Sequence, residues 1–192
     1  MTIWRHADWS IEAEFGDDAI LYSRYPHPAA SVRRSPRLAS SQVRDVDSAE
    51  FPPQIRTTSG ETLFVPREGR FGLAEFAARN RVPEVRRPDL WSLVLEPFLD
   101  TEVTAHQIER VDGILRTHGL TDVEIGDLRG RVSAMMESYN AFLWDWTDLN
   151  LYDLVCASSV WHRSDIDVGV AFYRWAMEIA DRPTGRSLPS AP

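Results

Sequence analysis

Residues 9–15 have the sequence Trp-Ser-Ile-Glu-Ala-Glu-Phe, in which apolar and polar side chains alternate. This two-residue period is typical of a β-strand, because successive side chains of a strand point to opposite faces. Residues 16–18 (Gly-Asp-Asp) favour a turn, and residues 19–23 return to β-favouring types until Pro26. The sequence therefore predicts a β-hairpin near the N-terminus.

A second hairpin is predicted further along the chain. Residues 54–58 and 61–65 are rich in β-favouring side chains, and the pair Ser59-Gly60 between them favours a tight turn. Residues 29–53 show little periodicity, so a long loop is expected there, with a short strand around residues 41–46. The N-terminal half is thus predicted to be an antiparallel sheet of about four strands.

From about residue 70 the apolar period changes from two to about 3.6 residues, which indicates helices. Thr104 with Gln107 and Thr121 with Glu124 have the spacing of capping boxes, and Gly119 suits a helix C-terminus. The helices are expected within residues 73–80, 90–95, 104–118, 121–146, 149–157 and 165–179, the last of them capped by Asp165 or Ser164. The predicted fold class is α+β, with five to six helices after the sheet.

Charge is divided unevenly along the chain. Residues 1–87 carry 13 arginines against 12 acidic residues, a net charge of +1, whereas residues 88–192 carry 8 against 17, a net charge of −9. We therefore expect one α+β domain over residues 1–182, made of a β-rich subdomain (1–87) and an acidic helical subdomain (88–182). Residues 183–192 are expected to form a disordered tail.

All 21 basic residues of the chain are arginines, and this absence of lysine excludes several functions. Schiff-base enzymes, protein kinases and Walker-type nucleotide hydrolases need a lysine amine as nucleophile or phosphate ligand. The one cysteine, Cys156, lies in an apolar helical context and is expected to be buried. Without an apolar signal segment or membrane span, the sequence predicts a soluble, cytoplasmic protein with no membrane association.

The segment around residues 144–153 is the candidate partner-binding surface. It combines large aromatic side chains with carboxylates, as do binding hot spots within a charged rim. The residues proposed to bind a partner are Trp144, Asp145, Trp146, Asp148, Tyr152 and Asp153. The alternative is that the aromatic side chains belong to the core and the aspartates face solvent.

A weaker candidate is a metal site. Glu102, His106 and Glu109 are spaced so that one helix face could present all three. A complete helical-bundle site needs matching ligands from other helices, and the chain offers no second Glu-x-x-His. A solvated helix start is therefore favoured, and no cofactor is expected.

Nucleic-acid binding is the other alternative. Residues 71–82 resemble the first helix and turn of a helix-turn-helix, and arginines follow at positions 79, 81, 86 and 87. Pro88 would lie inside the second helix, where it removes a hydrogen bond and clashes with the preceding turn. Arg33, Arg34 and Arg37 are better explained as a solvated loop than as a phosphate clamp.

Together these features favour a non-catalytic interaction or regulatory protein that presents its acidic helical half to a protein with a basic surface. A metal-assisted enzyme of unknown substrate is the alternative, followed by nucleic-acid binding through the N-terminal arginines. The sequence predicts neither the partner nor the oligomeric state.

Overall fold

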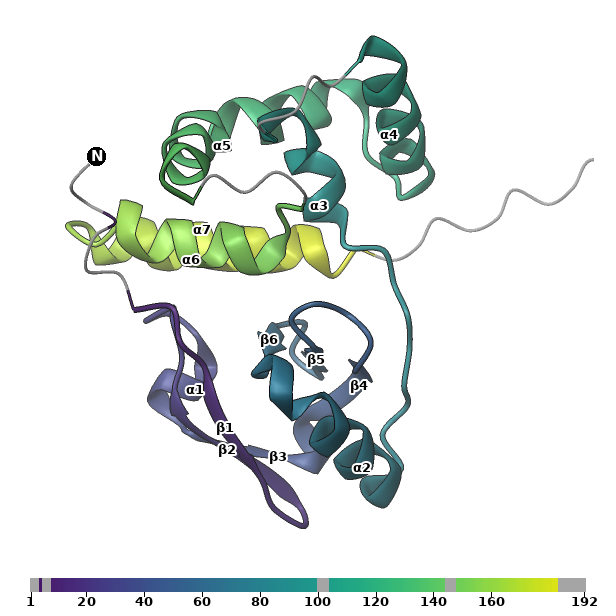
Figure 1. Cartoon of the computed structure of the whole chain (residues 1–192), viewed down its shortest axis with the longest axis vertical. Helices are drawn as coiled ribbons and strands as arrows, with labels where there is room; N and C mark the ends of the chain where they lie inside the picture. The colour runs from purple at the N-terminus through teal and green to yellow at the C-terminus, as the bar shows by residue number, and fades with distance from the viewer. Residues whose placement is uncertain (1–3, 5–7, 100–103, 144–147, 183–192) are drawn as a thin grey trace, which may run out of the picture.

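The computed structural model describes residue 4 and residues 8–99, 104–143 and 148–182. β-Strands fill much of the first part of the chain, and helices dominate the part that follows Pro88 (Figure 1). The predicted α+β class is therefore confirmed. The predicted C-terminal tail, residues 183–192, lies outside the described residues.

The first sheet contains the predicted N-terminal hairpin. Strand β1 (Glu12–Phe15) pairs antiparallel with β2 (Ala19–Arg24), and β3 (Arg37–Ala39) pairs with the other edge of β2. On β2, Ile20 and Tyr22 are buried while Leu21 between them is 47% exposed. The sheet therefore turns one face toward the core, as the alternating sequence pattern predicts.

The connection between β2 and β3 is not the expected long loop, which is a correction to the sequence prediction. It contains the one-turn helix α1 (Ser31–Arg34), and Ala30 and Val32 are buried in the core. An element of four residues is too short to show a helical period, and tertiary packing determines where it forms. The strand expected around residues 41–46 is present as β4 (Val43–Asp47).

The second sheet has the order β4-β5-β6, with β5 at Gln54–Thr57 and β6 at Thr62–Phe64. Gly60 closes the β5–β6 turn with a φ of 86°, a left-handed conformation that glycine adopts without the steric cost of a Cβ. The second predicted hairpin is confirmed. In the described chain the strands form two three-stranded sheets, rather than a single sheet of about four.

Helix α2 (Arg70–Asn80) follows the second sheet, and the described residues 81–89 that come next contain no helix. Val46 of β4 instead forms a parallel bridge with Glu84, through the bonds Val46 N to Pro83 O (2.9 Å) and Val85 N to Val46 O (2.8 Å). The second helix of a helix-turn-helix is thus not formed at this place, because the segment extends along a strand.

The C-terminal half contains five α-helices in the described residues. They are α3 (Leu90–Leu95), α4 (Ala105–Thr117), α5 (Asp122–Leu143), α6 (Leu151–Trp161) and α7 (Ile166–Ala180). The predicted caps are in place, since Thr104 forms a capping box with Gln107 and Asp165 accepts a hydrogen bond from Val168 N. These caps fix where α4 and α7 begin.

Asp89 caps two helices at once. One carboxylate oxygen, Oδ1, accepts hydrogen bonds from the amides of Trp91 (2.8 Å) and Ser92 (3.3 Å) in α3. The other oxygen, Oδ2, accepts from the amide of Leu151 (3.0 Å), the first residue of α6. A single side chain therefore satisfies the free N–H groups of two helix N-termini.

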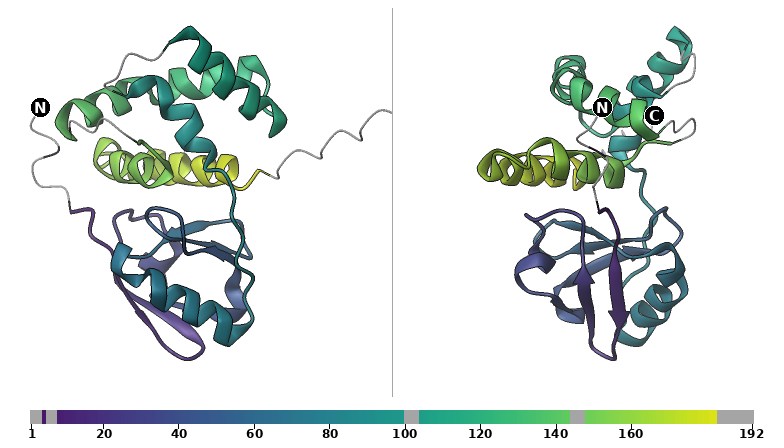
Figure 2. Two further views of the ribbon diagram at one scale, coloured as in Figure 1. Left: turned by 45° about the vertical axis from the view of Figure 1, so that its right-hand side comes forward. Right: turned by 60° about the vertical axis from the view of Figure 1, so that its left-hand side comes forward.

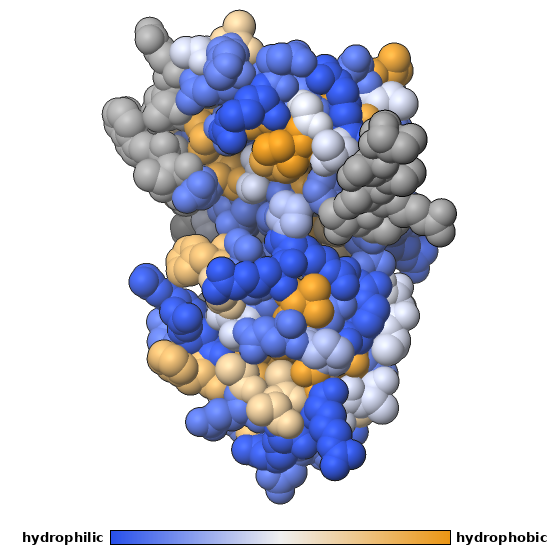
Figure 3. Space-filling view, turned by 90° about the vertical axis from the view of Figure 1, so that its right-hand side faces the viewer, coloured by the Kyte–Doolittle hydropathy of each residue, from blue (hydrophilic) through white to orange (hydrophobic). Residues whose placement is uncertain are grey.

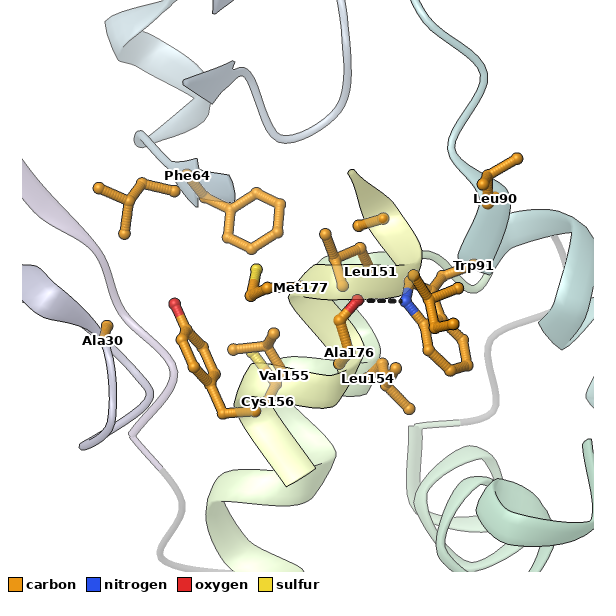
Figure 4. Close-up of a cluster of buried hydrophobic side chains, with 14 of the residues drawn as sticks. Ala30, Phe64, Leu90, Trp91, Leu151, Leu154, Val155, Cys156, Ala176 and Met177 are labelled. Carbon is orange, nitrogen blue, oxygen red and sulfur yellow. Dashed lines mark hydrogen bonds between the residues drawn. The ribbon is translucent and has the colours of Figure 1, made fainter. Parts of the chain in front are cut away.

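Figure 2 shows the elements in three tiers: the sheets with α1 and α2, then α6 and α7, then α3, α4 and α5. Buried apolar side chains form one cluster through all three tiers. Figure 4 shows part of this cluster, in which Phe64 of β6 points toward α6 and α7. In the same region Trp91 donates from Nε1 to the carbonyl of Ala176 at 2.9 Å. The middle tier thus packs against both neighbours.

One face of the molecule, shown in Figure 3, is covered mainly by hydrophilic residues, with apolar residues in separate groups. Scattered apolar side chains of this kind are normal for a protein surface. None of the helices in the described ranges has the length and apolar character that crossing a membrane requires.

Candidate functional site

A cleft of about 540 Å³ lies where the β-sheet half meets α7. Its volume falls within the range of small-molecule sites, which often form where two structural units meet. Three segments supply its walls, namely α1 with the residues just before it, the β5–β6 turn and the C-terminal part of α7. Its lining residues are Ala29, Ser31, Arg34, Ser59, Gly60, Glu61, Tyr173, Arg174, Met177, Glu178, Asp181 and Arg182.

Glu61 connects the three walls of the cleft. Its Oε1 accepts a hydrogen bond from the backbone N–H of Ser31 in α1 (3.0 Å) and another from the hydroxyl of Tyr173 in α7 (2.8 Å). Glu61 itself belongs to the β5–β6 turn, directly after Gly60. Because each wall is hydrogen-bonded to the same carboxylate, the cleft has fixed walls before any ligand arrives.

The turn approaches the end of α7 closely. A Cβ added at Gly60 would lie 3.0 Å from Oδ2 of Asp181, so the position also suits glycine for lack of space. Asp181 is held in turn by the guanidinium of Arg44 through two hydrogen bonds, one of 3.0 Å from Nη1 and one from Nη2. Such a two-point contact fixes the direction of the carboxylate.

Behind Asp181 lies a buried carboxylate surrounded by arginines. Asp45 is 3% exposed, and its Oδ2 accepts hydrogen bonds from Nε of Arg44 and Nη2 of Arg87, each at 2.9 Å. Arg56, 5% exposed, lies 4.0 Å from Oδ1 of Asp45, and burial lowers the pKa of its guanidinium. Arg44 therefore joins Asp45 of the sheet to Asp181 at the end of α7.

His27 lies behind Tyr173, one of the residues that line the cleft. Its ring is 1% exposed and stacks on Tyr173 with a centroid separation of 4.5 Å. Its Nδ1 accepts a hydrogen bond from the amide of Ala29 at 3.1 Å, which suits the neutral ring. Burial, aided by the charge of His162, lowers the pKa of His27 to about 4.

This shift predicts a loss of stability in mild acid. The folded-state pKa of His27 is below the unfolded value of 6.5, so the unfolded chain takes up the proton first as the pH falls. The contribution is present above pH 6.5 and is lost progressively down to about pH 4, amounting to about 3 kcal/mol. Urea unfolding between pH 7.5 and 4 measures it.

His27→Phe keeps an aromatic ring against Tyr173 but cannot titrate, so its unfolding free energy is expected to fall less steeply with pH. His106→Phe, at an exposed histidine, is the control and should keep the wild-type slope. Equal slopes for wild type and His27→Phe would contradict the assignment.

The predicted partner-binding residues lie away from this cleft as far as the structure describes them. Trp144, Asp145 and Trp146 lie outside the described residues, and Asp148 is exposed. Tyr152 is partly buried, with its hydroxyl donating to the carbonyl of Trp9 at 2.6 Å and its ring against Phe64 at 5.3 Å between centroids.

Asp153 has a structural role at the start of α6. It accepts hydrogen bonds from the hydroxyl of Tyr139 (3.1 Å) and the amide of Asn150 (3.0 Å), which completes a capping box. Two members of the predicted surface, Tyr152 and Asp153, thus hold α6 in place. Asp148 presents its carboxylate to solvent.

The predicted metal-site residues are only partly described. Glu102 lies outside the described residues, while His106 and Glu109 are both exposed on α4. Glu109 accepts a hydrogen bond from Nη1 of Arg116 at 2.9 Å, so a neighbouring cation already pairs with it. Within the described ranges, no group of three or more His, Cys, Asp or Glu residues has a metal-binding arrangement.

Cys156 is buried in α6, as its apolar sequence context predicts. Burial raises the pKa of its thiol well above the ordinary value, because the thiolate loses its hydration. The neutral thiol is a poor nucleophile, which supports a packing role for this residue.

The cleft could not be predicted from the sequence alone. The Ser59-Gly60 turn was predicted, but Arg34 was expected to lie in a solvated loop. The available signal was on α7, where Arg174, Glu178 and Asp181 recur at helical spacing and so share one face of the helix. Their proximity to residues 29–34 and 59–61 follows only from the tertiary fold.

A search of protein-family models, curated proteins and solved structures gives no match to this chain. The functional conclusion is therefore drawn from the geometry of the chain itself.

Proposed function

We propose that this protein is a non-catalytic regulatory protein that binds a small ligand in the cleft between its β-sheet half and α7. The observation that carries the proposal is the origin of the cleft walls, with α1 and the β5–β6 turn on one side and α7 on the other. A ligand in this place contacts both halves and stabilises their mutual packing. Binding of the ligand would therefore raise the free energy of unfolding of the whole chain.

The chemistry of the walls supports binding. Arginine, carboxylate and tyrosine groups provide directional contacts, and the Glu61 hydrogen bonds to Ser31 N and Tyr173 hold them in position. Fixed polar groups beside apolar surface are the usual composition of small-molecule sites. Because the groups are ordered in advance, a ligand loses less free energy in arranging them.

The test compares thermal unfolding in plain buffer with unfolding in the small-molecule filtrate of a cell extract. Wild-type protein should unfold at a higher temperature in the filtrate, because a ligand at 100 times its Kd stabilises the folded state by about 2.7 kcal/mol. Ser59→Trp places an indole in the cleft wall and should abolish the increase. Thr58→Trp is the matched control, since Thr58 is exposed in the same turn but does not line the cleft.

An increase that Ser59→Trp leaves intact would place the ligand elsewhere. Equal unfolding temperatures of the wild type in buffer and in filtrate would contradict ligand binding itself.

The acidic helical half supports a second proposal, binding of a protein with a basic surface. The net charge of −9 over residues 88–192 and the exposed carboxylate of Asp148 favour it. A pull-down from native lysate with Trp146→Ala/Asp148→Ala tests the surface, and recovery of the same partners as the wild type would discard it.

A reducing cytoplasm is the proposed compartment, supported by the single buried cysteine.

A further inference from the structure

We infer that the ligand of the cleft carries a carboxylate or phosphate group, which Arg34 and Arg174 bind from opposite walls. This inference rests on the proposed function, because it names the chemistry of the ligand at that same site. It depends on which charged groups of the cleft already have a partner and which remain available.

Two of the lining charges are paired within the chain. Arg182 donates from Nη2 to Oε1 of Glu124 at 2.9 Å, and Asp181 is bound by both Nη atoms of Arg44. The Asp181 carboxylate is therefore directed toward the sheet and its own cation. Neither residue is left to neutralise another charge in the cleft.

Glu61 has hydrogen-bond partners in the cleft wall, but neither of the two is a cation. Its Oε1 accepts from a backbone amide and from the Tyr173 hydroxyl, two neutral donors that order the carboxylate but leave its charge in place. These two hydrogen bonds hold Glu61 against the cleft wall. An arginine that lines the cleft could bind Oε1 closely only by competing with them.

Arg34 and Arg174 form no ion pair or side-chain hydrogen bond with another residue in the described parts of the chain. Both are exposed, Arg34 at the end of α1 and Arg174 in α7, and both line the same cleft. Two cations that face one cavity repel each other, and an anion between them removes this repulsion. The planar guanidinium binds carboxylates and phosphates through paired hydrogen bonds, which suits either head group.

Glu178 limits the kind of anion that fits. It stands one helical turn after Arg174, lines the cleft and forms no ion pair within 4.0 Å among the described residues. Its charge repels any anion, and because the repulsion grows with the number of charges it weighs more against an extended polyanion, such as a nucleic-acid backbone, than against one compact anionic group beside the arginines. The cleft is thus suited to a small molecule with a single anionic head.

The rest of the ligand meets a less polar surface. Ala29 and Met177 belong to the lining. Met177 is 5% exposed, and its sulfur accepts a hydrogen bond from Thr62 N at 3.3 Å. A compact apolar body attached to the anionic head would cover this surface, and its burial would add to the affinity. Phenyl phosphate and benzoate have this combination of groups.

The test is a titration of the isotope-labelled full chain at constant ionic strength, followed through the backbone amide signals of Gly60 and Glu61. The probes are phenyl phosphate, benzoate and benzyl alcohol, which share an aromatic ring and differ in the head group. Both anions should give saturable shifts, with the neutral alcohol binding at least about tenfold more weakly. The tighter anion identifies the preferred head group.

Arg34→Gln/Arg174→Gln should raise the Kd of the anionic probes by at least about tenfold. The matched control is Arg33→Gln/Arg163→Gln, which removes the same number of charges from exposed arginines outside the cleft lining, and its Kd should stay within about twofold. Equally tight binding of benzyl alcohol, or an unchanged Kd in the cleft variant, would overturn the anionic assignment.

The two proposals fail separately. If the filtrate stabilises the protein in a manner sensitive to Ser59→Trp while neither anionic probe binds, the cleft binds a ligand of another class and only this inference is wrong. If the filtrate has no effect and the probes do not bind, the proposed function is wrong as well.

Discussion

Replacing Asp45 with asparagine is expected to lower the free energy of unfolding by about 3–5 kcal/mol. The Asp45 carboxylate is 3% exposed and is the acceptor for Arg44 and Arg87, with Arg56 at 4.0 Å. The amide is nearly the same size but carries no charge, so the arginines around it lose their common counter-ion. Urea unfolding followed by circular dichroism measures the loss.

Asp18→Asn is the control for the Asp45 variant. Asp18 also accepts a hydrogen bond from an arginine, Arg37 at 2.8 Å, but the Asp18 side chain is 77% exposed. Water screens such a pair, and its removal should change the unfolding free energy by about 1 kcal/mol or less. Similar small losses in both variants would show that the Asp45 cluster contributes little to the packing of the two halves.

Replacing Trp91 with alanine is expected to lower the free energy of unfolding by about 3–5 kcal/mol. Trp91 is fully buried, packs edge-on against Trp175 at 5.2 Å between ring centroids, and donates from Nε1 to the carbonyl of Ala176 at 2.9 Å. The alanine leaves a cavity between α3 and α7 and a carbonyl without this donor. Urea unfolding followed by far-ultraviolet circular dichroism avoids the change in tryptophan fluorescence.

Trp91→Phe separates the two contributions. Phenylalanine retains an aromatic ring in the core but cannot donate to Ala176, so its expected loss is smaller, about 1–3 kcal/mol. If Trp91→Ala were no more destabilising than Trp91→Phe, the volume of the indole ring would have little part in joining α3 to α7.

The local elements of this fold could be predicted where the sequence has a period or a cap. The alternation in residues 9–15 led to the β1–β2 hairpin, and Thr104 and Asp165 marked the starts of α4 and α7 correctly. Helix α1 and strand β3 could not be predicted, because elements of four and three residues carry no period. Their positions depend on burial of side chains such as Val32 in a core that distant segments build.

The site was harder to predict than the fold. The walls of the cleft come from residues 29–34, 59–61 and 173–182, and no local pattern relates segments so far apart in the chain. The aromatic and acidic composition near residue 150 predicted a binding surface there instead. The structure shows that Tyr152 and Asp153 have packing and capping contacts, which an amino-acid sequence cannot distinguish from exposure.

The shared cap at Asp89 has a consequence for how the helical half folds. Its two oxygens hold amides of α3 and of α6, which are separated by about 60 residues of chain that include α4 and α5. The Leu151 amide has this acceptor only while α3 and α6 lie together, so separation of the two helices exposes it. The helical half should accordingly open cooperatively, with the amides of Trp91 and Leu151 exchanging their hydrogens at matching rates.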